Sequence, residues 1–183
     1  MSTNGVPGIL KNKGVSAEAV KALSALKSEP GWLTEKRLEA WRTFEKMPMP
    51  SLRDEAWRYT DISDVRIEDF VPYAPSPEAS SERDLPEAVQ TLIKEGEQNS
   101  ALIVQHNSET AYSRVDKELS RRGVVFTDLL TALEEHEDLV REKLFGLVPM
   151  DYDKFAALSA AAFSGGSFLY VPRGVDIEVP IQS

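Results

Sequence analysis

Apolar side chains recur at helical intervals through the first half of the chain, which predicts two amphipathic helices. The first is expected behind Ser16, whose hydroxyl suits an N-cap, and is expected to stop near Ser28. The second is expected to begin at Thr34 and to end before Pro48, because proline breaks a helix. Residues 54–70 hold bulky side chains without a regular period and predict loop and short turns over the core.

Shorter apolar runs in the second half predict strands that alternate with helices. A hairpin is expected from residues 101–105 and 111–115, because Asn107 and Ser108 between them are turn-forming residues. Residues 123–126 predict a third short strand. Three further helices are expected. The first covers residues 85–95 and ends at Gly96, and the second begins after Thr127 as its N-cap and breaks near His136. The third begins after Asp153 as its N-cap and ends at Gly165 and Gly166.

The last residues show the most regular pattern of the chain. Residues 167–171 predict a strand, and residues 172–174 predict a turn. Apolar residues then alternate with polar ones over 175–182, which is the period of a strand with one buried face. Pro180 lacks an N–H group and favours a sheet edge. Because a strand needs a neighbour, we expect the natural protein to continue beyond Ser183.

These elements predict an α+β fold with a mostly helical N-terminal domain and a few short strands. Residues 1–14 are rich in glycine and predict a flexible arm, and residues 15–163 are expected to form the N-terminal domain. Prolines among serines and acidic residues predict a linker near 72–86 inside that domain. Residues 164–183 are expected to begin a second structure whose remainder is truncated.

Composition and charge narrow the class of protein. The chain has 183 residues, of which 42% are hydrophobic and 28% charged, and this is typical of a soluble globular protein. Its net charge of −9 argues against nucleic acid or an anionic membrane as partner. There is no cysteine, no signal-peptide pattern, and no apolar run near the roughly 18 residues of a membrane helix. A cytoplasmic location is expected.

Few side chains suggest chemistry, and a structural role explains each of them better. His106 and His136 are far apart in the sequence, and the acidic residues around His136 are expected to face solvent. The pair Asp151 and Asp153 is better explained by one of them capping a helix. Residues 164–167 lack the pattern of a phosphate-binding loop and predict a helix-to-strand turn. We therefore expect no catalytic, cofactor-binding or metal-binding residue in this chain.

Aromatic residues offer one further possibility, a platform for a ligand or partner. Trp32, Trp41, Trp57 and Tyr59 are the residues concerned. Trp41 falls in the apolar stripe of the second predicted helix and is expected in the core. Trp57 and Tyr59 fall in the predicted loop region, where docking of a partner protein stays open.

Several segments resemble the SufB/SufD family of iron–sulfur cluster assembly proteins. The segments are Glu29–Leu33 with Arg37, Ala40 and Trp41; residues 54–61 (DEAWRYTD); residues 153–158 (DKFAAL); and residues 163–175 (FSGGSFLYVPRGV). Residues 54–61 resemble the motif that distinguishes SufD from its paralogue SufB. The last segment resembles one that both paralogues share, and the likeness runs in order from Ala17 to Ser183. Little family signal lies between Pro72 and Arg122.

The resemblance implies a SufD-like scaffold subunit of the SUF system that is not an enzyme by itself. In this family the shared segment leads into a right-handed parallel β-helix, and the complete protein pairs with a SufB-like paralogue and binds a SufC-like ATPase. The family's docking and assembly residues lie further along, so none is carried over and no cofactor is expected in this fragment. Two alternatives stay open: a fragment of a β-helix enzyme with downstream catalytic carboxylates, and a free-standing interaction module. The edge strand also leaves a homodimer open.

Overall fold

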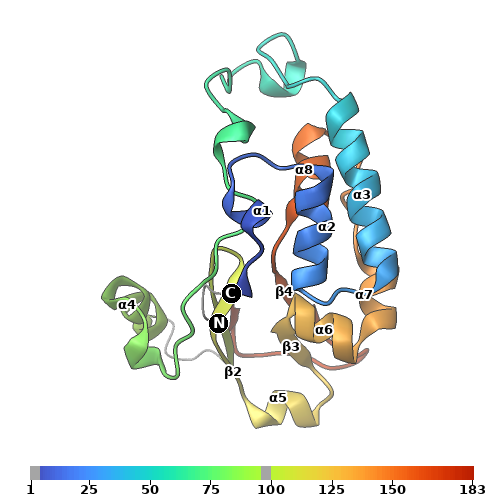
Figure 1. Cartoon of the computed structure of the whole chain (residues 1–183). Coiled ribbons are helices and arrows are strands. Elements are labelled where there is room, and N and C mark those ends of the chain that lie inside the picture. Colours follow the sequence, from blue (N-terminus) through green and yellow to red (C-terminus); the bar gives the residue numbers. More distant parts are fainter. Residues whose placement is uncertain (1–4, 96–99) are drawn as a thin grey trace. The chain divides into compact units, whose positions relative to one another are not determined.

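The computed structural model describes residues 5–95 and 100–183, and these form two compact units (Figure 1). The helical unit comprises the described part of Ser2–Ala74 together with Asp138–Phe163, and the strand unit comprises Pro75–Glu137 and Ser164–Ser183. The chain leaves the helical unit within the proline-rich stretch expected as a linker. The expected ranges 15–163 and 164–183 differ from this division, because strands on both sides of residue 163 pair with one another.

Three helices pack together in the helical unit: α2 (Ala17–Leu26), α3 (Gly31–Lys46) and α8 (Lys154–Ala162) (Figure 1). Their shared core combines bulky side chains of α2 and α3 with small side chains of α8. It contains Val20, Ala40, Trp41, Phe44, Ala157, Ala160 and Ala161. The alanines of α8 let its backbone come close to α3, which lets a short helix of low amphipathicity pack tightly. A further helix, α7 (Glu137–Lys143), begins at the boundary of the two units.

The ends of these helices confirm one predicted cap and correct another. Ser16 caps α2 as predicted, because its hydroxyl accepts a hydrogen bond of 3.1 Å from the Ala19 N–H. The predicted start of the next helix at Thr34 is wrong, since α3 begins directly after Pro30. The Pro30 carbonyl accepts hydrogen bonds from the first turn, and an N-cap does not need the N–H that proline lacks. The helix ends before Pro48, as predicted.

The range assigned to a flexible arm contains the one-turn helix α1 (Gly8–Lys11). Leu10 of this helix is fully buried against Leu23 and Tyr73. The Gly14 N–H donates to the carbonyl of Phe70 at 2.8 Å. The described residues of this range therefore pack on the helical unit.

The loop region predicted after α3 is confirmed. It contains two 3-10 turns, η2 (Glu55–Trp57) and η3 (Ile67–Asp69), joined by irregular chain.

The strand unit contains the predicted hairpin. Strands β1 (Ala101–His106) and β2 (Glu109–Val115) pair antiparallel. Asn107 and Ser108 both adopt positive φ between them, as a tight hairpin turn requires. Gly165 lies so close to this turn that a Cβ atom there would overlap the Ser108 carbonyl oxygen.

Two further pairings join the end of the chain to earlier strands. Strand β3 (Val125–Asp128) pairs antiparallel with β4 (Ser167–Tyr170), so the third strand begins two residues later than predicted. Strand β5 (Ile181–Gln182) pairs parallel with β1, which gives a sheet of order β2-β1-β5.

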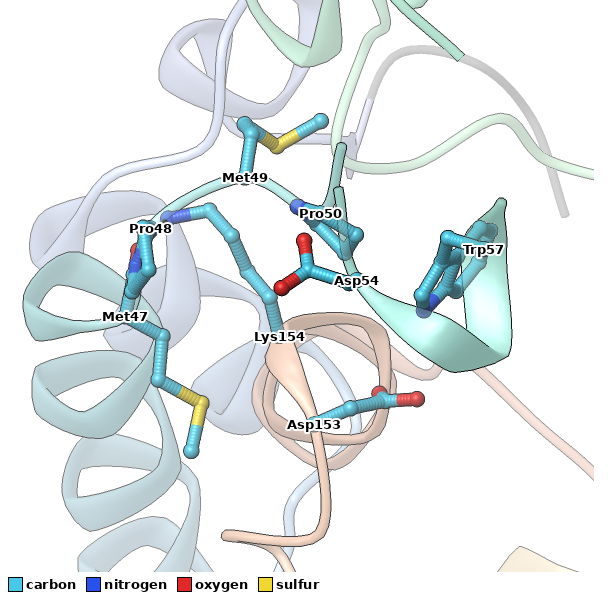
Figure 2. Close-up of a pocket in the computed structure, with 8 residues that line it drawn as sticks. All are labelled: Met47, Pro48, Met49, Pro50, Asp54, Trp57, Asp153 and Lys154. Atoms are coloured by element: carbon cyan, nitrogen blue, oxygen red, sulfur yellow. Dashed lines mark hydrogen bonds between the residues drawn. The ribbon is translucent and has the colours of Figure 1, made fainter. Parts of the chain in front are cut away.

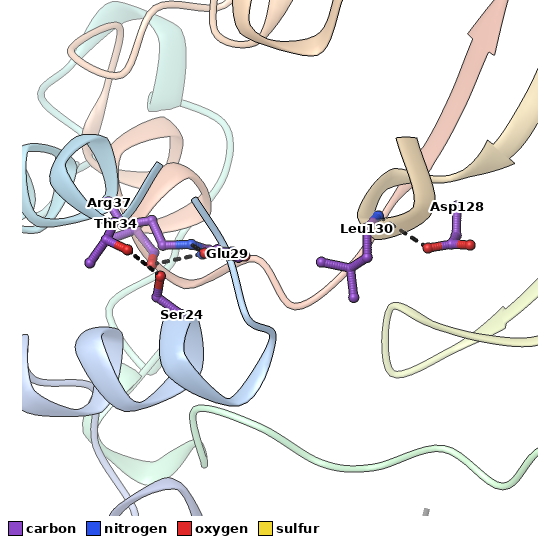
Figure 3. Close-up of polar contacts among 7 residues, drawn as sticks. Ser24, Glu29, Thr34, Arg37, Asp128 and Leu130 are labelled. Carbon is purple, nitrogen blue, oxygen red and sulfur yellow. Dashed lines mark hydrogen bonds and ion pairs between the residues drawn. The ribbon is translucent and has the colours of Figure 1, made fainter. Parts of the chain in front are cut away.

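Three α-helices and a 3-10 turn complete the strand unit: η4 (Glu82–Asp84), α4 (Glu87–Glu95), α5 (Lys117–Arg121) and α6 (Leu129–Glu135). The expected cap at Thr127 is wrong, because the neighbouring Asp128 carboxylate accepts a hydrogen bond of 3.1 Å from the Leu130 N–H (Figure 3). It also accepts one of 3.0 Å from the Thr131 N–H. The predicted break at His136 is confirmed. Gly96, expected to close α4, lies outside the described residues.

The alternating pattern at the end of the chain predicts burial better than it predicts pairing. Val175, Ile177 and Ile181 pack against the core formed by β1, β3 and α5, and Asp176 and Glu178 are exposed. Val179, which the alternation places on the buried face, is 40% exposed, so the prediction is wrong for this residue. Only residues 181–182 of the expected strand over 175–182 join a sheet, so the strand prediction is wrong for residues 175–180. A turn closed by the Val175 N–H and the Pro172 carbonyl precedes them, and the missing N–H of Pro180 interrupts any ladder.

Candidate functional site

A fully buried ion pair, Glu29–Arg37, lies within the first of the segments that carry the family resemblance (Figure 3). The guanidinium of Arg37 donates to both carboxylate oxygens of Glu29, at 2.7 and 2.6 Å, and both side chains have an exposed fraction of 0%. It also donates to the carbonyl of Ala161 at 3.1 Å and lies 3.7 Å from the centre of the Phe163 ring. These contacts hold α3 to the end of α8. Because neither side chain reaches solvent, a substrate has no access to the pair, and its role is structural.

A hollow of about 250 Å³ opens where the loop after α3 meets the start of α8 (Figure 2). Its walls combine apolar side chains with two carboxylates and one ammonium group. The lining residues are Met47, Pro48, Met49, Pro50, Asp54, Trp57, Asp153 and Lys154. We call this the Met47–Lys154 hollow. It lies entirely within the helical unit and is the candidate functional site.

The ammonium group of Lys154 is occupied inside the protein. It donates to the carbonyls of Phe44 and Met47 at 2.8 and 2.6 Å, and lies 4.0 Å from the centre of the Phe44 ring. These carbonyls stand at the C-terminal end of α3, where a positive charge is favourable. Lys154 therefore closes the end of that helix.

The two carboxylates of the hollow each use one oxygen for local structure. Asp54 accepts hydrogen bonds from the N–H and the hydroxyl of Ser51 at 2.7 and 3.1 Å, both through Oδ2. Asp153 caps α8 as predicted, because its Oδ1 accepts from the Ala156 N–H at 2.7 Å. The second oxygen of each group is left for another donor.

Trp57 forms one side of the hollow and links two family segments. Its ring lies 5.4 Å from the ring of Phe155 in α8, and the side chain is half-buried.

The loop after α3 also contains a carboxyl group with a lowered pKa. The backbone N–H of Ser63 donates to Asp61, and this hydrogen bond, together with one from the Ser63 hydroxyl, lowers the pKa of the Asp61 carboxyl.

The other aromatic residues considered from the sequence lie in different environments, and the prediction for Trp41 is confirmed. Trp41 is a core residue, as predicted, with an exposed fraction of 7% and its ring 5.0 Å from that of Phe44. Trp32 lies in α3 with the Arg141 guanidinium 5.5 Å from its ring centre. Tyr59 is 86% exposed.

The residues weighed for metal or acid–base chemistry are not brought together. His106 is exposed at the end of β1, and the His136 ring stacks on Phe168 at 6.3 Å. Asp151 is exposed while Asp153 serves as a cap. Over residues 5–95 and 100–183, no three histidine or carboxylate side chains are grouped so as to hold a metal ion.

Sequence reasoning missed most of the hollow. It considered Trp57 and Asp153 separately, and it did not consider the methionines, Asp54 or Lys154 as parts of one site. The available signal was the alternation of two methionines with two prolines over residues 47–50, because a helix cannot continue through these prolines. Nothing local in the sequence links this loop to α8.

Comparison with known proteins assigns the chain to a family. Residues 19–183 match the family model described as the N-terminal region of SufBD proteins. The chain belongs to the SufBD family. The resemblance predicted from the four sequence segments is thereby confirmed.

Among curated relatives are iron-sulfur cluster assembly SufBD family proteins of staphylococci. The protein of Staphylococcus epidermidis is 36% identical over 181 residues, and those of Staphylococcus haemolyticus and Staphylococcus aureus are 35% identical over 181 and 180 residues. Each alignment covers 93% of this chain and 37% of the relative, so the chain spans just over a third of the length of these proteins. Within the part of the chain that is described, no helix has the length and apolar character to cross a membrane.

Proposed function

We propose that this chain is the N-terminal part of a SufD-like scaffold subunit of the SUF iron–sulfur cluster assembly system. Membership of the SufBD family over residues 19–183 is the observation that carries the proposal. The SufD assignment within the family is supported by residues 54–61, which resemble the motif that separates SufD from SufB. That motif supplies Asp54 and Trp57 to the hollow, so it contributes to a surface as well as to folding.

In this proposal the chain has no catalytic step of its own and works in the cytoplasm. The complete protein pairs with a SufB-like paralogue and binds a SufC-like ATPase, and the cluster is its cargo. The helical unit stabilises the start of the right-handed parallel β-helix that follows in the family. The parallel pairing of β5 with β1 and the inward face of Val175, Ile177 and Ile181 are compatible with such a continuation.

A pull-down tests the scaffold role. The tagged 183-residue chain and the tagged complete product of its gene are each incubated with the SufC-type ATPase and the SufB-type paralogue of the same organism. We expect the complete product to retain both partners and the 183-residue chain to retain no ATPase. If the complete product retains neither the ATPase nor the paralogue, the proposed scaffold role is wrong.

Two measurements test the absence of chemistry in this chain. After anaerobic incubation with iron and sulfide, the isolated chain should show no stoichiometric iron–sulfur absorption band, and it should not hydrolyse ATP. A stable band at one cluster per chain, or steady ATP turnover that a point substitution here abolishes, would contradict the non-catalytic role.

A further inference from the structure

The Met47–Lys154 hollow presents negative charge beside an indole ring. In the view of Figure 2 the Lys154 side chain extends toward Pro48, the Asp54 carboxylate lies between Lys154 and Trp57, and the Asp153 carboxylate points away from Lys154. Two of the three N–H donors of the Lys154 ammonium are used by the carbonyls of Phe44 and Met47. The hollow is therefore lined by two carboxylates, each with one oxygen outside the local hydrogen bonds, and by one ammonium group that is held by backbone carbonyls.

Other cations of the same loop do not neutralise these carboxylates. Arg58 forms an ion pair with Glu55 at 2.9 Å. Arg53 lines a separate hollow next to Asp61. The hollow thus has an electrostatic preference for a positive group, and the chain as a whole has a net charge of −9.

We propose that the Met47–Lys154 hollow binds an arginine side chain presented by a partner protein. A guanidinium is flat and can stack on the Trp57 ring while its N–H groups reach the carboxylates of Asp54 and Asp153. The methionine and proline walls accommodate its methylene stem. Lysine fits less well, because a compact, strongly hydrated ammonium neither stacks nor bridges two carboxylates in this way.

Exposed apolar side chains near the hollow point to a protein as the source of the arginine. Met49, Leu52 and Tyr59 have exposed fractions of 39%, 51% and 86%, and all belong to the same loop. Such residues around a charged pocket are typical of a protein interface with one anchoring residue. A free small molecule would leave them uncovered.

This inference deepens the proposed function by naming one partner-facing surface of the scaffold. Its test uses direct binding of small probes to the chain. The pull-down described above can therefore fail while this test succeeds, and the reverse also holds.

The first experiment measures binding of N-acetyl-arginine amide to the chain by NMR, following the indole N–H signal of Trp57. The variant Trp57→Phe assigns that signal. We expect a saturable shift, and binding of N-acetyl-citrulline amide weaker by about tenfold or more, because citrulline keeps the shape but lacks the charge. Equal binding of the two probes, or no saturable shift, would overturn the proposal.

Charge removal at the carboxylates tests the geometry. Asparagine keeps the local hydrogen bonds, including a helix cap, so Asp54→Asn and Asp153→Asn should remain folded. Each should weaken binding of the arginine probe by about fivefold or more, since each removes a charge-assisted hydrogen bond. The control is Asp64→Asn, which removes an exposed charge of the same loop and should change affinity less than about twofold. Unchanged binding in Asp54→Asn, a loop substitution, contradicts the proposal even if Asp153→Asn misfolds.

A third arm separates a protein partner from a small molecule. The peptide acetyl-Leu-Arg-Leu-amide should bind about fivefold tighter than N-acetyl-arginine amide, because its flanking leucines can cover the exposed apolar side chains. Leu52→Ser should reduce this gain without changing binding of the single-residue probe. If peptide and single-residue probe bind equally, the assignment to a protein partner is wrong.

Discussion

Replacing Arg37 by methionine tests how much of the stability of the helical unit depends on the buried ion pair. The substitution leaves the Glu29 carboxylate fully buried and removes its two hydrogen bonds of 2.6 and 2.7 Å, together with the 3.1 Å bond from Arg37 to the Ala161 carbonyl. Removing one partner of such a pair costs about 3–5 kcal/mol, because the remaining charge is neither solvated nor paired. For a chain of this length that corresponds to a fall in melting temperature of roughly 6–20 °C.

Urea unfolding followed by tryptophan fluorescence measures the loss in free energy of unfolding of the helical unit. The three tryptophans, Trp32, Trp41 and Trp57, all belong to the helical unit. The double variant Glu29→Met, Arg37→Met removes both charges and should cost less than either single substitution, since an apolar pair needs no compensating charge. The reasoning is refuted if Arg37→Met costs under about 1 kcal/mol, or if the double variant costs the sum of the two single ones.

Three other substitutions test the packing of the two units. Gly165→Ala should destabilise the chain by about 2–3 kcal/mol or more, because the new Cβ would overlap the Ser108 carbonyl oxygen. In the matched control Gly166→Ala the Cβ would lie 3.4 Å from the nearest side-chain carbon, so the loss of stability should be much smaller. Equal losses in the two variants would contradict the close approach at Gly165. Trp41→Ala should cost about 3–5 kcal/mol in urea unfolding, and a cost under about 0.5 kcal/mol would place the ring outside the core. Burial raises the pKa of Tyr73 above its ordinary value of 10.0. The stability that the neutral Tyr73 side chain contributes is therefore present below about pH 10 and is lost as pH rises through the raised pKa. Tyr73→Phe should flatten the alkaline fall in stability, and an unaltered fall would contradict this cause.

Local features of the fold were largely predictable, because their causes lie within a few residues. The caps Ser16 and Asp153 and the hairpin turn at Asn107 and Ser108 follow from side-chain chemistry next to an apolar run. The error at Asp128 has the same origin. Thr127 and Asp128 are adjacent residues at the end of β3 that can both cap a helix, and their chemistry alone does not select the second.

Pairing between distant segments was not predictable in the same way. The partners β3 and β4, and β1 and β5, are separated by long stretches of chain, and nothing in their own residues specifies the partner. The alternation of residues 175–181 correctly indicated burial of Val175, Ile177 and Ile181 but not of Val179, and burial against a core does not require a hydrogen-bonded ladder.

The candidate site was half predictable. The loop position of Trp57 and its availability to a partner followed from the sequence around it. Its neighbours Asp153 and Lys154 come from another part of the chain, and only the packing of α8 against α3 brings them to the loop. The same holds for the Glu29–Arg37 pair, where neither residue is distinguishable from a surface charge by its local pattern.

We propose that this SufBD family chain belongs to a scaffold subunit for iron–sulfur cluster assembly. The most direct measurement is the cluster occupancy of an enzyme carrying a four-iron, four-sulfur cluster, in cells that lack the gene for this protein and express no second assembly system. We expect the enzyme to accumulate at normal level without its cluster, and we expect iron and sulfide added anaerobically to restore its activity. A fully loaded enzyme in those cells would contradict it.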